Sequence, residues 1–60
     1  MKELYKVYPK GNQPIKIFRT AESALSYLSK VKGKMVKVLR FEELLDNSIV
    51  EKEIYWKEER

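Results

Sequence analysis

Basic side chains are the groups in this chain whose types and spacing most readily suggest chemistry. Five of them occur between residues 30 and 40: Lys30, Lys32, Lys34, Lys37 and Arg40. Cations at this spacing could contact successive phosphates of a nucleic acid, and each contact would add a salt-dependent contribution to the affinity. Aromatic residues also lie among basic ones in the segments LYKVYPK and IKIFR, a composition typical of surfaces that stack nucleic-acid bases.

Nucleic-acid binding is therefore one hypothesis for this chain. It would use seven basic residues: Lys10, Lys16, Arg19, Lys30, Lys32, Lys34 and Lys37. The alternative interpretation is that these lysines complement the end of a helix and keep the following strand solvated. No sequence motif of a known nucleic-acid-binding domain accompanies them. Residues 41–60 carry a net charge of −4, which would repel phosphates.

Carboxylates are the second group that could do chemistry. They are Glu42, Glu43, Asp46, Glu51 and Glu53. Oxygen ligands suit hard cations, but these residues do not follow the spacing of a calcium-binding loop, so we expect ordinary surface charges and no metal. The chain has no Cys and no His, which excludes thiolate and imidazole ligands and the usual nucleophile–base pairs. We expect a protein that is not an enzyme and takes no cofactor and no small-molecule substrate.

The length of 60 residues allows one small domain, residues 1–60. A chain this short buries only about 60% of its unfolded surface, and without cysteine no disulfide can compensate. Association with another chain is the remaining source of stability. The net charge of +4 divides into +8 over residues 1–40 and −4 over residues 41–60, a polarity that could guide the choice of partner or the pairing of subunits.

The N-terminal segment MKELYKVYPKG contains charges and no apolar core of a signal peptide. No stretch of the sequence approaches the length of about 18 apolar residues that a membrane span needs. We therefore expect a soluble cytoplasmic protein without a membrane partner.

Hydrophobic periodicity predicts an α+β fold in the order β-β-α-β-β, an antiparallel sheet with one helix packed on one face. The expected strands are residues 2–8, 14–20, 34–41 and 49–58, and the expected helix is residues 21–31. Thr20 is a good N-cap for this helix and Gly33 a natural residue after its end. Turns are expected at residues 9–14 and 46–48. The sequence leaves open whether residues 41–45 extend the strand or form a helical turn.

Both faces of the expected sheet carry apolar side chains, although one helix can cover only one face. We predict an uncovered patch of four residues: Phe18, Leu39, Phe41 and Tyr55. Trp56, next to Tyr55 and on the opposite face, is expected to fill the core. Two alternatives would leave no patch: the segment FEELL folds back over the second face, or the stems of Lys and Glu side chains cover it.

The leading hypothesis is a non-enzymatic protein-binding module. It would form a homodimer and dock on another macromolecule, an unidentified protein, through its aromatic-rich sheet surface, since aromatic residues are preferred interface anchors. The small size and lysine-rich composition would suit an accessory or inhibitor protein of a phage or mobile element. Nucleic-acid binding by the basic segment of residues 1–40 is the alternative.

Overall fold

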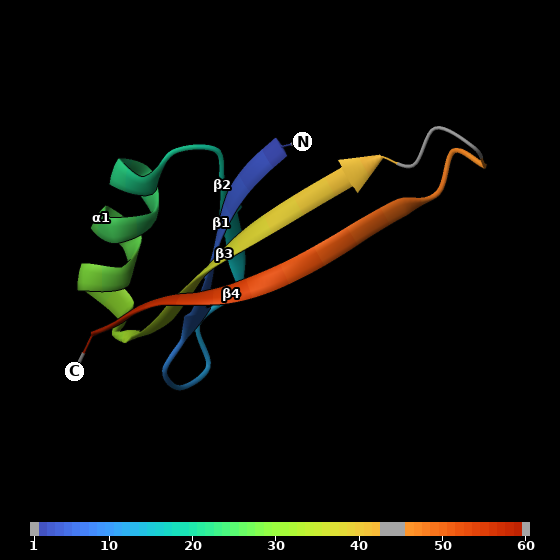
Figure 1. The fold of residues 1–60 in the computed structure, drawn as a ribbon. Coiled ribbons are helices and arrows are strands. Elements are labelled where there is room, and N and C mark those ends of the chain that lie inside the picture. The colour runs from blue at the N-terminus through green and yellow to red at the C-terminus, as the bar shows by residue number, and fades with distance from the viewer. Residues whose placement is uncertain (1, 43–45, 60) are drawn as a thin grey trace.

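The computed structural model describes residues 2–42 and 46–59. Along the described chain the elements are β1 (Lys2–Pro9), β2 (Lys16–Phe18), α1 (Ala21–Val31), β3 (Gly33–Glu42) and β4 (Ile49–Glu59). The strands form an antiparallel sheet in the order β2-β1-β3-β4, and the helix, which follows two strands, packs on it (Figure 1). The predicted α+β class with a four-stranded antiparallel sheet and one helix is confirmed.

Strand β2 is much shorter than the sequence suggested. It pairs with β1 over three positions only, from Tyr5↔Phe18 to Val7↔Lys16. Pro14 lacks a backbone N–H and cannot donate to a ladder, and its carbonyl instead accepts a hydrogen bond of 2.7 Å from the Tyr27 hydroxyl. Thr20 already belongs to the helix cap. Both ends of the expected strand are therefore used to attach the helix.

The helix begins and ends as the sequence predicted. Thr20 is the N-cap and its side chain accepts a hydrogen bond of 3.3 Å from the Ser23 N–H. After Val31 the backbone turns at Lys32, which has φ of 55° and donates to the carbonyl of Leu28. Gly33 follows with φ of 133°, and a Cβ there would lie 2.2 Å from the Tyr8 carbonyl oxygen. Glycine is required at that position because strand β1 passes so close.

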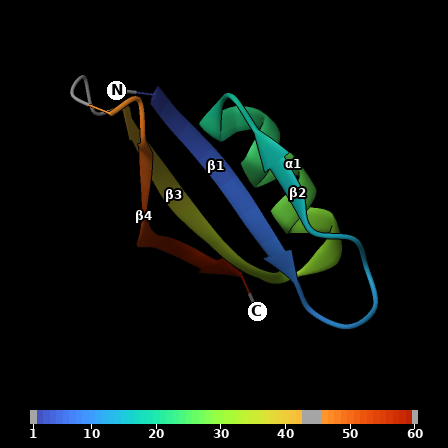
Figure 2. The same ribbon diagram turned by 90° about the vertical axis from the view of Figure 1, so that its right-hand side faces the viewer.

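The hydrophobic core lies between the helix and one face of the sheet. Its fully buried residues are Val7, Ala24, Leu28 and Met35. Tyr5 shares a face of β1 with Val7, and Phe18 is the partner of Tyr5 on β2. Both side chains pack around this centre. Figure 2 shows α1 behind β1 and β2, while β4 lies at the far edge of the sheet. We call the side on which α1 packs the helix side and the other side the open face.

Strands β3 and β4 form a long hairpin that projects from the body of the molecule (Figure 1). We call this hairpin the arm. Residues 41 and 42 belong to β3, and residues 43–45, where the sequence left strand and helical turn open, lie outside the described residues. The predicted turn at residues 46–48 is confirmed, since the Ser48 N–H donates to Asp46 Oδ1 at 2.9 Å and Asn47 has φ of 58°.

Candidate protein-binding surface

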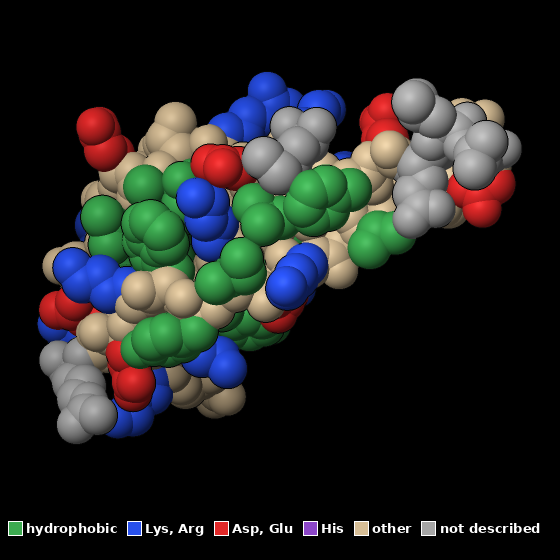
Figure 3. Space-filling model, in the orientation of Figure 1, with side chains coloured by type: hydrophobic (Ala, Val, Ile, Leu, Met, Phe, Trp, Pro, Cys, Tyr) green, Lys and Arg blue, Asp and Glu red, His purple; other side chains and the backbone are tan. Residues whose placement is uncertain are grey.

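An apolar surface remains uncovered on the helix side of the arm. Alternation along β3 and β4 places two lysines there, Lys37 and Lys52, together with five hydrophobic residues: Leu39, Phe41, Val50, Ile54 and Trp56. We call these five residues the arm surface. Four of them are 38–45% exposed, and Leu39 is half-buried. Figure 3 shows hydrophobic side chains gathered over β3 and β4 beyond the helix. The eleven-residue helix is too short, and too far toward β1 and β2, to cover this part of the sheet.

Trp56 lies where the arm surface joins the body of the molecule. Met35 pairs with Lys57 and Val36 with Tyr55, so Trp56 is the extra residue of a β-bulge. Its ring lies edge-to-face against Tyr5, with ring centroids 5.9 Å apart, and the Lys37 ammonium lies 5.1 Å from its centroid. The prediction that Trp56 fills the core is wrong: the residue is 44% exposed because β4 is an edge strand that the helix does not reach.

The four residues of the predicted patch do not form one surface. Leu39 and Phe41 belong to the arm surface. Phe18 is on the helix side but half-buried beneath α1, where its ring lies 5.7 Å from that of Tyr27. Tyr55 is 60% exposed on the open face, opposite Val36. The predicted patch did not include Val50 and Ile54. Their even positions in the last strand, which they share with Trp56, place all three residues on one face and would have indicated them once the face covered by the helix was known.

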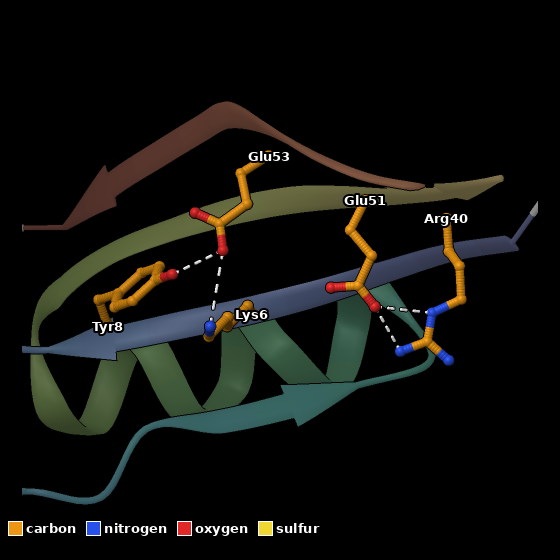
Figure 4. Close-up of polar contacts among 5 residues, drawn as sticks. All are labelled: Lys6, Tyr8, Arg40, Glu51 and Glu53. Carbon is orange, nitrogen blue, oxygen red and sulfur yellow. Dashed lines mark hydrogen bonds and ion pairs between the residues drawn. The ribbon is translucent and has the colours of Figure 1, made fainter. Parts of the chain in front are cut away.

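Polar side chains lie along the centre of the open face (Figure 4), and three exposed hydrophobic residues, Ile17, Ile49 and Tyr55, lie around them. Glu53 Oε1 accepts a hydrogen bond of 2.7 Å from the Tyr8 hydroxyl and lies 3.5 Å from the Lys6 ammonium. Arg40 Nε donates to Glu51 Oε1 at 2.8 Å. Beneath these side chains two valines of β3, Val36 and Val38, are only 6% and 5% exposed.

Val36 pairs with Lys6 and Tyr55, and Val38 pairs with Leu4 and Glu53. Lys and Glu side chains, which one alternative expected to cover the second face, thus flank these valines together with Leu4 and Tyr55. The other alternative depends on residues 41–45, of which only Phe41 and Glu42 are described, and both lie in β3.

The polar contacts of the open face shift the pKa values of two side chains, Glu53 and Lys6. The hydrogen bond from Tyr8, followed by the charge of Lys6, holds the pKa of Glu53 below its usual value. The interaction with Tyr8, followed by the charge of Glu53, raises the pKa of Lys6. Each charged form is thereby favoured in the folded protein. These contacts form a structural network on an exposed face.

The basic residues proposed for nucleic-acid contact do not form one row. Lys10, Lys32 and Lys34 lie at one end of the sheet, where the Lys10 N–H donates to the Lys32 carbonyl at 2.8 Å. Glu58 and Glu59 pair with Lys34 and Gly33 at the same end and reduce its positive charge.

The other proposed cations are dispersed. Lys16 lies on the short edge strand, its ammonium 4.8 Å from the centroid of the Tyr27 ring. Lys37 is in the arm, 3.4 Å from Glu3. Arg19 precedes the helix, whereas Lys30, in its last turn, lies at the same end as Lys32. The cations thus occupy several faces and not a continuous groove.

Among residues 2–42 and 46–59, no cluster of three or more acidic, His or Cys side chains could hold a metal ion, and no described helix is long and apolar enough to cross a membrane. No protein-family model matches the chain, and no curated protein or solved structure matches it either. Any functional inference therefore depends on the surfaces of the molecule itself.

Proposed function

We propose that this chain is a non-enzymatic protein-binding module and that the arm surface binds a second copy of the chain to form a homodimer. The observation that carries the proposal is the uncovered apolar strip on the helix side of the arm. Phe41 and Trp56 are aromatic anchors of the kind that interfaces prefer. Val50 pairs with Phe41, and Ile54 lies on the same face two residues from Trp56, with Lys52 between Val50 and Ile54.

The total surface area of the molecule supports association. The chain exposes 4758 Å², whereas a folded monomer of its mass typically exposes about 4,100 Å². The excess of roughly 600 Å² approaches the area of about 800 Å² that each partner buries in a standard interface. The arm contributes to the exposed area, because four residues of its helix side are 38–45% exposed. Packing two arm surfaces together would bring the exposed area close to that of a typical globular protein.

The open face is a less suitable interface. Its valines are already buried beneath paired side chains, and docking there would require desolvation of the Lys6–Glu53 and Arg40–Glu51 pairs. Nucleic-acid binding by the basic segment is also less well supported, because the cations are dispersed and several have acidic neighbours. If it occurred, a mobility-shift assay at low salt would detect it and the affinity would fall steeply as salt is raised.

Sedimentation equilibrium of the wild type and two variants tests the proposal. Ile54→Asp introduces a charge in the centre of the arm surface and is expected to weaken the dimer at least about tenfold, as loss of a central anchor does in other interfaces. Tyr55→Asp makes the same change at the next residue, on the open face, and is expected to leave the dimer intact. Circular dichroism would verify that both variants keep the helix.

A wild type that stays monomeric from micromolar to millimolar concentration would overturn the proposal. So would equal weakening by both variants, since the contact would then not be specific to the helix side of the arm.

A further inference from the structure

The charges of this molecule are unevenly distributed along its longest dimension of 42 Å. Glu42 and Asp46 are exposed at the tip of the arm, and Figure 3 shows acidic side chains there. The opposite end carries four exposed lysines: Lys10, Lys30, Lys32 and Lys34. These lysines are close to one another because the helix ends, β1 ends and β3 begins at this point. Even with Glu58 and Glu59 nearby, the lysines are in excess.

The arm surface lies between the acidic tip and the basic end. From Ile54, β4 runs five residues to Ile49, which pairs with Glu42 next to the turn at Asp46, and five residues in the other direction to Glu59. At about 3.3 Å per residue, each distance is roughly 17 Å. Glu59 pairs with Gly33, next to the basic end. Two copies that pack their arm surfaces with the arms antiparallel would therefore place each acidic tip beside the basic end of the other copy.

We propose that the two copies pair in this antiparallel arrangement, related by a two-fold axis that crosses the arms near Ile54. The inference rests on the proposed homodimer and specifies its geometry. A parallel arrangement would bring the two acidic tips together and the two basic ends together, and like charges brought together in an interface oppose binding. The antiparallel pair instead makes two identical attractive contacts, one at each end.

The test is a charge-exchange experiment with two exposed double variants. The tip variant is Glu42→Lys with Asp46→Asn, in which the asparagine oxygen can still accept the hydrogen bond from Ser48. The end variant is Lys10→Glu with Lys32→Glu. Each variant alone is expected to weaken the homodimer about tenfold or more, because both contacts become repulsive or lose their attraction. Mixed in equal amounts, the two variants are expected to form heterodimers, since every tip then faces an end of opposite charge.

A matched control separates this contact from an effect of net charge. Lys2→Glu with Arg19→Glu changes the charge by the same amount as the end variant, but at exposed positions near β1 and β2. Native mass spectrometry distinguishes the homodimers from the heterodimers by mass. The control mixed with the tip variant is expected to show no preference for the heterodimer.

The outcomes separate the two proposals. If the wild type dimerises through Ile54 but the tip and end variants show no heterodimer preference, the antiparallel arrangement is overturned and the homodimer stands. If the wild type is monomeric, both fall. A heterodimer preference equal to that of the control would also overturn the arrangement, because net charge alone would explain it.

Discussion

Trp56 of β4 lies edge-to-face against Tyr5 of β1, with the ring planes inclined by 72° and the centroids 5.9 Å apart. The two strands are not neighbours, because β3 separates them in the sheet. The contact therefore crosses β3 on the helix side and joins the edge strand to the residues around the core, to which Tyr5 belongs. The arm surface begins at this contact.

Replacing Trp56 by Ala is expected to lower the free energy of unfolding by about 1–3 kcal/mol. An aromatic pair contributes roughly 0.5–1.5 kcal/mol beyond its buried area, and the buried part of the indole adds a further transfer contribution. Urea denaturation monitored by circular dichroism measures the change. Both proteins in this comparison also carry Ile54→Asp, so that dissociation of a dimer does not contribute to the measured free energy of unfolding. Trp56→Phe should be destabilised less than Trp56→Ala, because a phenyl ring can still contact Tyr5. An unchanged urea midpoint in Trp56→Ala would mean that the ring pair does not contribute to stability.

Phe18 and Phe41 are expected to respond differently to the same substitution. Phe18→Asp places a charge beneath the helix, next to Tyr27, and an unpaired polar group in such a site together with the lost packing costs about 3 kcal/mol or more. A chain this small has few kcal/mol to lose, so the helix signal should disappear. Phe41→Asp lies on the arm and should keep the helix while weakening self-association. A folded Phe18→Asp variant would contradict the placement of Phe18 under α1.

The two glycines provide a second matched pair. Gly33→Ala is expected to destabilise the protein strongly, because the new Cβ would lie 2.2 Å from the Tyr8 carbonyl oxygen and φ is 133°. Gly11→Ala has no atom within 4 Å of the new Cβ, so only the cost of its positive φ, about 1–2 kcal/mol, applies. Thermal unfolding of both variants gives the comparison. A Gly11→Ala variant as damaged as Gly33→Ala would show that steric contact with β1 is not the deciding factor.

Stability is expected to decrease in acid, in part through Glu53. The pKa of Glu53 is lower in the folded protein than its ordinary value of 4.5, first because of the Tyr8 hydrogen bond. Its contribution is therefore present above that ordinary value and is lost as the pH falls through the lowered folded pKa. Glu53→Gln should reduce the difference in urea midpoint between neutral pH and about pH 3. Identical pH profiles for the wild type and the variant would contradict this role.

Asp46 contributes to the same acid-dependent loss. Its pKa is lowered by the hydrogen bond with Ser48, so Glu53→Gln should reduce the pH dependence without abolishing it. Lys6 acts in the opposite range: its pKa is raised from 10.5, so its contribution is present below that value and is lost as the pH rises through the raised folded pKa.

Local features were readable in the sequence because their causes lie within a few residues. Thr20 caps the helix through Ser23, three residues away, and Ala24 and Leu28 share one helical face because they are four positions apart. Asp46 forms its turn with Ser48 in the same way. Alternation also placed Trp56 and Tyr55 on opposite faces of the last strand, as their partners Tyr5 and Val36 show.

The sequence by itself therefore determined the helix, the turns and the side chains that share a face of each strand. Only the tertiary structure decided the strand order, the face that the helix covers and how far its cover extends. Those features depend on pairs distant in sequence, such as Tyr5 with Trp56 or Val7 with Met35, and a period of two along a strand cannot specify them. This is why Phe18 lies under the helix and Tyr55 on the open face, while Phe41, Ile54 and Trp56 share the exposed helix side of the arm.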